Sequence, residues 1–151
     1  MALTRWTQVL DVLNSTTGFT YDPNGNLLSV TDARSNATAY TYDNMDRLAT
    51  RQDPLLRTES YQYNLSGNMT QFTDRKSQAT SYRYDARNRR TGVTYADTST
   101  TAYTYDAGNR LTSETTPQGS VSYTYDAAGR RTNETNHLPA SIFSYRDSPK
   151  F

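Results

Sequence analysis

The dipeptide Tyr-Asp recurs along this 151-residue chain at a nearly fixed interval, which is 21 residues four times in succession and then 20 residues twice. The third copy is Tyr63-Asn64, and the last is a degenerate Tyr145-Arg146. A second aromatic residue stands two positions before each of these tyrosines, so twelve of the thirteen tyrosines belong to one ladder and only Tyr95 lies outside it. A fixed period of this length indicates a tandem array, in which each repeat is a supersecondary unit stabilised by packing on its neighbours.

The ladder supplies most of the apolar surface, because Leu, Ile, Val and Phe are scarce while Tyr and Thr are abundant. Tyrosine rings bury a large apolar area and keep a polar hydroxyl, so they suit a core in a polar chain. We therefore expect the ladder to form the structural core of the array. Its members in the complete repeats are Phe19, Tyr21, Tyr40, Tyr42, Tyr61, Tyr63, Tyr82, Tyr84, Tyr103, Tyr105, Tyr123 and Tyr125.

Residue types typical of tight turns follow the second aromatic residue of each ladder pair. The next position is Asp or Asn, whose side chain accepts backbone N–H bonds two residues on. The fourth position is Gly, Asn or Asp, the types that best tolerate a left-handed backbone. This pattern predicts a type I turn that ends in a left-handed residue. The predicted turn residues are Asp22 and Gly25, Asp43 and Asp46, Asn64 and Gly67, Asp85 and Asn88, Asp106 and Asn109, and Asp126 and Gly129.

Alternating β-branched and aromatic residues precede each turn, as in residues 38–42 and 101–105, which is typical of a β-strand. A second apolar-polar segment follows the turn, and further turn signals at Asp32, Asp53-Pro54 and Asp74 close the unit. Each repeat is thus predicted to be a β-hairpin. Six to seven copies give about fourteen strands, and open sheets of that size curl. We expect an all-β protein, a curved or spiralling antiparallel sheet over residues 1–146, with a partial first copy around Trp6 and Asp11 and a short tail at 147–151.

Composition favours an ordered chain despite a mean hydropathy of −0.90. The aromatic residues are frequent and regularly placed and the net charge is only +1, whereas disordered chains are poor in aromatics and strongly charged. Cysteine is absent, so disulfides and thiolate metal sites are excluded. No apolar segment reaches the length of a signal-peptide core or a membrane span.

The pattern Tyr-x-Tyr-Asp-x-x-Gly-Arg-Leu resembles the YD repeats of the Rhs (rearrangement hotspot) family, and residues 19–27 and 123–131 carry it best. That family includes bacterial Rhs polymorphic toxins, the B and C components of insecticidal Tc toxins, and teneurins. The resemblance implies strips of antiparallel sheet that spiral into a hollow β-shell, which in the bacterial members encloses a C-terminal toxin. The family's Asp-Pro-x-Gly type motif, linked to autoproteolytic release, is not present, since Asp53-Pro54 is followed by two leucines. The resemblance therefore implies the scaffold and not the protease or the toxin.

Candidate sites for chemistry are few. The only histidine, His137, lies in a turn-like segment, and the one carboxylate pair in equivalent phase, Glu114 and Glu134, is expected about 10 Å apart, at or beyond the upper limit for an inverting glycosidase. Calcium needs six to eight oxygens around one point, which a single turn Asp cannot provide. Arg and Asp are nearly balanced, so no basic groove for single-stranded nucleic acid is expected. We expect no catalytic residues, metal site or cofactor.

Two functional hypotheses follow. The first is a non-enzymatic structural module, part of a YD-repeat shell that encapsulates a toxin or presents a surface. The alternative is a carbohydrate-binding module with exposed rows of Tyr and Arg. Buried rings would argue against the alternative, whereas a continuous exposed row would favour it. The expected partners are neighbouring repeats of a larger shell, another copy paired through open sheet edges, an enclosed toxin or a glycan, with no nucleic acid. The resemblance implies a secreted or cell-surface location as part of a bacterial export-system protein.

The arginine that often follows the turn is expected either to pair with Asp or to stack on a Tyr ring of the next copy. The sequence does not choose between these two contacts.

Overall fold

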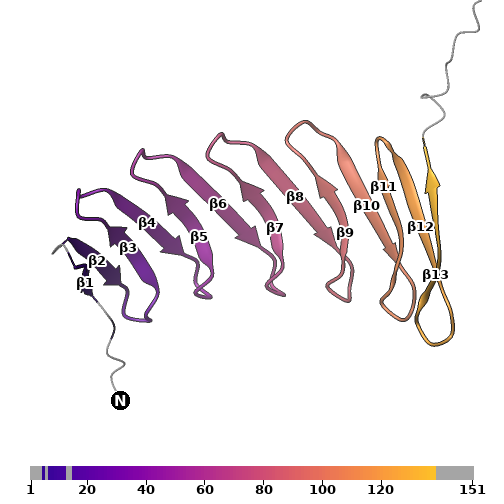
Figure 1. Cartoon of the computed structure of the whole chain (residues 1–151), viewed down its shortest axis with the longest axis horizontal. Coiled ribbons are helices and arrows are strands. Elements are labelled where there is room, and N and C mark those ends of the chain that lie inside the picture. The colour runs from indigo at the N-terminus through magenta and orange to yellow at the C-terminus, as the bar shows by residue number, and fades with distance from the viewer. Residues whose placement is uncertain (1–4, 6, 13–14, 139–151) are drawn as a thin grey trace, which may run out of the picture. The chain divides into compact units, whose positions relative to one another are not determined.

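The computed structural model describes residue 5, residues 7–12 and residues 15–138, and in these residues it contains thirteen β-strands and no helix (Figure 1). The predictions that concern Trp6, Tyr145-Arg146 and the tail 147–151 lie outside the described residues. The strands are β1 (Gln8–Leu10), β2 (Thr16–Tyr21), β3 (Leu27–Thr31), β4 (Ala37–Tyr42), β5 (Leu48–Gln52), β6 (Thr58–Tyr63), β7 (Met69–Thr73), β8 (Ala79–Tyr84), β9 (Arg90–Thr94), β10 (Thr100–Tyr105), β11 (Leu111–Thr116), β12 (Gly119–Tyr125) and β13 (Arg131–His137).

The chain forms two compact units, unit 1 over residues 1–79 and unit 2 over residues 80–151, with the boundary at the start of β8. In unit 1 each of β1 to β6 pairs antiparallel with the next strand in sequence. In unit 2 the same holds from β8 to β13. Each unit is an antiparallel meander. The predicted all-β architecture of tandem hairpins is confirmed.

The turn that follows the second tyrosine of each ladder pair has the predicted backbone. In the first complete repeat the Gly25 N–H donates to the Asp22 carbonyl at 3.1 Å, and the Asp22 N–H donates to the Asn26 carbonyl at 3.0 Å. The fourth residue has a positive φ in every one of these turns. The values are 101° for Gly25, 57° for Asp46, 83° for Gly67, 60° for Asn88, 65° for Asn109 and 80° for Gly129.

Turns at the opposite edge of each unit use the same geometry with less typical residues. The Ser35 N–H donates to the Asp32 carbonyl at 3.0 Å, as in the Tyr-Asp turns. Positive φ falls on residues that rarely adopt it, which include a bulky leucine and a β-branched threonine. These residues are Ser35 (63°), Leu56 (61°), Ser77 (61°) and Thr98 (68°).

One of these opposite turns is shorter and accounts for a change in the repeat period. Five residues separate the paired Thr94 and Thr100 between β9 and β10, whereas four separate the paired Thr115 and Ser120 between β11 and β12. Loss of one residue from that turn reduces the interval between Tyr105 and Tyr125 from 21 residues to 20.

Each unit has two chemically different faces, because side chains alternate along a strand and the pairing keeps equivalent positions in line. The first, which we call the tyrosine face, carries the aromatic ladder with its partners, as in Phe19 opposite Val30 and Tyr82 opposite Val93. The second, which we call the hydroxyl face, carries mainly Thr and Ser side chains that bond across strands, as in Thr41 to Thr50 at 2.6 Å between Oγ1 atoms, although Gln62 pairs with Gln71 and Arg83 with Gly92 on the same face. Further pairs on this face are Thr20–Ser29 at 2.7 Å and Thr104–Ser113 at 2.7 Å.

Few side chains are buried. Among the described residues only Val93, Asp53 and Thr101 are less than a tenth exposed, and none is fully enclosed. The ladder rings are half-buried. The apolar surface of each unit is therefore covered by neighbouring strands and side chains of the same face rather than by a second layer.

The left-handed corner gives the first prediction. Gly129→Val should destabilise the protein by about 1–3 kcal/mol, because it places a β-branched residue at φ 80°. A Cβ at this position would meet only the Arg110 Nη1 atom at 3.5 Å, an ordinary contact, so the loss comes from the backbone. The matched control is Ala128→Val on the exposed neighbouring residue, expected within about 0.5 kcal/mol of wild type. Equal losses in urea denaturation would contradict the turn assignment.

Candidate functional site

The best-defined side-chain arrangement in both units begins with the turn aspartate. In the second complete repeat Asp43 Oδ1 accepts the backbone N–H groups of Met45 at 2.9 Å and Arg47 at 3.0 Å. The second oxygen, Oδ2, binds Arg47 Nε at 2.7 Å and Nη2 at 2.7 Å. One carboxylate thus closes the turn and fixes the guanidinium that follows it.

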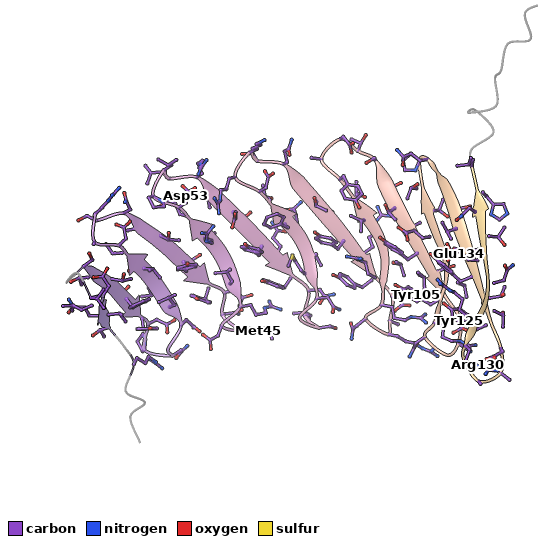
Figure 2. All side chains as sticks on the ribbon, viewed as in Figure 1. Met45, Asp53, Tyr105, Tyr125, Arg130 and Glu134 are labelled. Carbon is purple, nitrogen blue, oxygen red and sulfur yellow. The ribbon has the colours of Figure 1, made fainter. Side chains whose placement is uncertain are left out.

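The same Asp–Arg pair recurs four residues apart in later Tyr-Asp turns and in one opposite turn. In each pair Nε of the arginine lies 2.6–2.8 Å from Oδ2 of the aspartate. The pairs are Asp53–Arg57, Asp85–Arg89, Asp106–Arg110 and Asp126–Arg130, and Figure 2 shows Asp53 and Arg130 at turns.

The fixed guanidinium also reaches the next repeat. Arg47 Nη1 donates to the Asn64 carbonyl at 2.8 Å, and its Cζ lies 4.7 Å from the centroid of the Tyr63 ring. Arg89 contacts the Asp106 carbonyl at 2.9 Å and the Tyr105 ring at 4.7 Å. Equivalent contacts join Arg110 to Asp126 (3.2 Å) and Tyr125 (4.9 Å), and Arg5 to Asp22 (3.5 Å) and Tyr21 (5.7 Å). The arginine therefore pairs with Asp of its own repeat and stacks on Tyr of the next one, which the sequence left open.

Tyrosine hydroxyls complete the contact in the reverse direction. Tyr105 Oη donates to the Arg90 carbonyl at 2.9 Å, and Tyr125 Oη donates to the Leu111 carbonyl at 2.6 Å. Both acceptors belong to the preceding repeat, and Figure 2 labels the two donor tyrosines. Each of these tyrosines thus receives a cation on its ring from the preceding repeat and returns a hydrogen bond to it. We call this set of contacts the Asp–Arg–Tyr link.

Two complete repeats depart from the link, because Asn26 and Asn68 stand where the other four have arginine. At the first of them the Asn26 Nδ2 donates to Asp22 Oδ2 at 2.9 Å and to Asp46 Oδ1 at 2.6 Å. The amide therefore joins its own turn to the next turn by hydrogen bonds alone.

Hydrogen bonding lowers the pKa of the turn carboxylates. At Asp85 the backbone N–H of Arg89 is the largest cause that lowers the pKa, and the Arg89 side chain adds to it. The pKa of Asp43 is lowered mainly by the Arg47 side chain. These aspartates carry a negative charge over the neutral pH range, as the link requires.

The ladder rings form neither a buried core nor a continuous exposed row. Every ladder tyrosine of the complete repeats is half-buried, and arginine covers several of the ring faces. Arg90 also lies over Tyr103 at 5.2 Å, and Arg131 lies over Tyr123 at 5.6 Å. Ring faces occupied by guanidinium are not free to stack on sugars, so this arrangement does not favour the carbohydrate-binding alternative.

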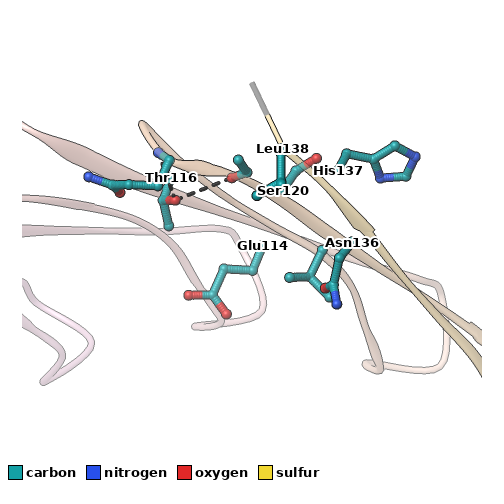
Figure 3. Close-up of a pocket in the computed structure, with 9 residues that line it drawn as sticks. Glu114, Thr116, Ser120, Asn136, His137 and Leu138 are labelled. Atoms are coloured by element: carbon teal, nitrogen blue, oxygen red, sulfur yellow. Dashed lines mark hydrogen bonds between the residues drawn. The ribbon is translucent and has the colours of Figure 1, made fainter. Parts of the chain in front are cut away.

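The candidate catalytic residues are not brought together. An open hollow of about 600 Å³ lies at the ends of β11, β12 and β13 and includes Glu114, Asn136 and His137 (Figure 3). Strand pairing puts Glu114, Val121 and Asn136 in one row, whereas His137 pairs with Ser120 on the opposite face. Figure 3 shows the His137 ring directed away from Glu114. Glu134 instead forms a surface ion pair with Arg131 at 3.0 Å.

The described part of the chain contains neither a metal-ligand group nor a membrane-spanning helix. No three Asp, Glu or His side chains there are grouped closely enough to hold a metal ion. The same residues include no helix of the length and apolarity needed to cross a bilayer.

Two features were missed by sequence reasoning. The left-handed residues of the opposite turns were not identified, although Asp32, Asp53 and Asp74 share the spacing of the Tyr-Asp turns and could have indicated them. The chemical contrast between the two faces was also missed. It is readable in the alternation, since the position between the two aromatic residues is Thr in four of the six complete repeats, with Gln62 and Arg83 in the other two, and the position before the first aromatic is Gly, Ala or Ser.

Comparison with known proteins gives a consistent picture. The family model described as RHS Repeat matches residues 3–36, 21–58, 63–100, 91–121 and 105–136. No curated protein matches the chain. Similar solved structures include the Photorhabdus luminescens Tc holotoxin pore with a mutated TccC3, the TcdB2–TccC3 crystal structure, and TcdB2–TccC3–Cdc42. Each is 22% identical with a TM-score of 0.67, and the match covers 81% of this chain but 7% of the other. At this identity the likeness shows the fold.

The tyrosine hydroxyl gives the second prediction. Tyr125→Phe should lower the free energy of unfolding by about 1 kcal/mol, because the Leu111 carbonyl loses its donor while the ring remains. The control is Tyr95→Phe, at a position that is 43% exposed and off the ladder, expected within about 0.5 kcal/mol of wild type. Chemical denaturation measures both, and equal values would show that the hydroxyl does not join the repeats.

The turn carboxylates give the third prediction, a loss of stability in acid. A carboxylate whose folded pKa is lowered stabilises the fold above its unfolded pKa of about 4, and this contribution is lost as pH falls through the lower folded value. The pKa is lowered at Asp43, Asp85, Asp106 and Asp126, so the free energy of unfolding should fall below about pH 4. Asp85→Asn should weaken this dependence, since the amide no longer titrates. An unchanged pH profile in urea titrations would contradict the assignment.

Proposed function

Because the chain belongs to the RHS repeat family, we propose that it is a non-enzymatic wall segment of a larger YD-repeat shell that encloses a polypeptide toxin. The family resemblance supports a shell with an enclosed toxin, and the single-layered antiparallel sheet of each unit supports a role in the wall of that shell. The similar solved structures are complexes that contain TcdB2 and TccC3, and this chain spans 7% of the matched chain. It would therefore form a small part of such a wall.

The Asp–Arg–Tyr link is the observation that carries this proposal. Each arginine is fixed in its own repeat and contacts the next repeat, so the contact can be reused as repeats are added. An array with nearest-neighbour contacts extends without needing a central core. A wall built from many repeats requires contacts of this kind, which can be extended from one repeat to the next.

The two faces of each unit support the same role. A single layer with half-buried side chains leaves the tyrosine face and the hydroxyl face both accessible. A wall needs one face toward its contents and one toward its surroundings. An enzyme instead needs converging acid, base or nucleophile groups, and His137 and Glu114 lie on opposite faces.

A graft tests the proposal and is the fourth prediction. In a chimera the hairpins of this chain replace the structurally matched hairpins of TcdB2–TccC3. If the chain is a wall module, the chimera should assemble with the size of the parent complex and keep its contents resistant to added protease. Size-exclusion chromatography, electron microscopy and proteolysis would measure this.

The control chimera carries Tyr105→Ala and Tyr125→Ala, which remove two rings of the link. It should assemble less stably and admit protease. A first chimera that folds, by circular dichroism, but leaves its contents as sensitive as free polypeptide would overturn the proposal.

A further inference from the structure

Unit 1 contains a cluster of charged side chains that departs from the repeat pattern. Arg51 occupies the position held by Val30, Phe72 and Val93 in other repeats, although the last two repeats have Glu there. Glu59 stands where Thr38 and Thr101 stand, and Arg75 stands where Ala33 and Ala96 stand. Asp53, which is labelled in Figure 2, and Arg57 lie in the turn between β5 and β6. We call these five residues, Arg51, Asp53, Arg57, Glu59 and Arg75, the charged cluster.

The cluster is one connected chain of contacts across β5, β6 and two turns. Asp53 Oδ2 binds Arg57 Nη2 at 2.7 Å and Arg75 Nη1 at 3.4 Å. Arg75 Nε lies 2.8 Å from Glu59 Oε1, and Arg51 Nη1 lies 3.4 Å from Glu59 Oε2. Glu59 Oε2 also accepts the hydroxyl of Tyr61 at 3.1 Å.

The carboxylates are more enclosed than the guanidiniums. The Asp53 and Glu59 side chains are 6% and 16% exposed, whereas Arg57, Arg75 and Arg51 are 51%, 34% and 31% exposed. The two carboxylates thus lie beneath three arginines that face outward. Arg75 Nε is buried without a well-aligned hydrogen bond among the described residues, although Glu59 is close.

Three guanidiniums and two carboxylates leave one positive charge uncompensated. Asp74 and Lys76, in the same turn as Arg75, carry opposite charges and add nothing to the balance. The long Arg75–Asp53 and Arg51–Glu59 contacts, both 3.4 Å, also leave donor capacity on these two arginines. A single additional carboxylate would neutralise the cluster and receive charge-assisted hydrogen bonds.

We propose that the charged cluster binds a carboxylate side chain of an acidic polypeptide segment. This rests on the proposed function, in which the wall lies against polypeptide. A planar guanidinium matches a carboxylate in a two-pronged geometry, and three of them at neighbouring positions suit a segment with repeated acidic residues.

The adjacent rings argue against an acidic sugar as the occupant. Tyr61 packs against Phe72 with ring centroids 5.2 Å apart, and its hydroxyl is already bonded to Glu59. Tyr40 pairs directly across the strands with Arg51. The rings thus support the ionic groups and offer no open platform for stacking on a sugar.

The fifth prediction is that the whole chain binds polyglutamate at low salt, as measured by calorimetry. The test variant combines Arg51→Val, Glu59→Thr and Arg75→Ala, so each position receives a residue found at the same place in this chain's other repeats. Affinity should fall at least about tenfold, since hydrogen bonds between charged groups are lost. The melting temperature should stay the same or rise, because packed neutral residues replace partly buried ions.

Controls separate a site from general attraction of charge. Arg34→Gln makes the same net change of one charge at an exposed turn and should alter affinity less than about twofold. Glu59→Gln should bind polyglutamate more tightly, because it frees Arg51 and Arg75, whereas Asp97→Asn, a matched change in an exposed turn of unit 2, should not.

Three results would overturn the inference. Equal losses in the triple variant and in Arg34→Gln would show non-specific attraction. Tighter binding of polygalacturonate than of polyglutamate would assign the cluster to an acidic sugar. Unchanged affinity in both the triple variant and Glu59→Gln would make the cluster purely structural. The triple variant placed in the graft chimera keeps the tests separate, because a chimera that still assembles and encloses leaves the wall proposal intact.

Discussion

A single carboxylate at the turn organises each linked repeat. Its two oxygens have separate partners, since in Asp43 one binds backbone N–H groups of the turn and the other binds the guanidinium of Arg47. The fixed arginine then presents its remaining edge and its flat face to the next repeat. Local turn formation and the joining of repeats therefore depend on the same group. Without the negative charge, the arginine would lose its charge-assisted partner and with it its orientation.

This arrangement explains how a very polar chain forms an ordered sheet without a second layer. Among the described residues Val93 is the only hydrophobic side chain less than a tenth exposed, so hydrophobic burial in a closed core is not the main stabilising term. Half-buried rings covered by guanidinium, cross-strand hydroxyl pairs and regular turns replace it. Each cation–ring contact is worth only about 0.5–2 kcal/mol, and stability accumulates because the contact is repeated. Because no second layer covers the sheet, both of its faces stay accessible, which supports the wall proposal.

The sequence predicted what is encoded by residues close together in the chain. The left-handed corners at Gly25, Asn88 and Asn109 follow from residue type, because these types tolerate positive φ. Leu56 and Thr98 were not predicted, since their side chains disfavour that conformation and the flanking turn hydrogen bonds impose it. Whether the arginine pairs with Asp or stacks on Tyr was left open, because the sequence does not show how the guanidinium is oriented. In the structure one guanidinium makes both contacts, since it has several N–H donors as well as a flat face. Arg51, Glu59 and Arg75 lie up to 24 residues apart, and only strand pairing and the turn positions bring them together.

A repeat protein also contains its own controls, and these bear on the charged cluster. Every repeat has to meet the same packing requirements, so residues at equivalent positions show what the scaffold alone needs. Val30, Thr38 and Ala33 satisfy those requirements without charge where Arg51, Glu59 and Arg75 stand one or two repeats later. Partly buried ion pairs are commonly no more stabilising than neutral residues of similar fit. The scaffold therefore does not require this cluster, and its surplus of positive charge is better explained by a partner that contacts the wall than by the wall itself.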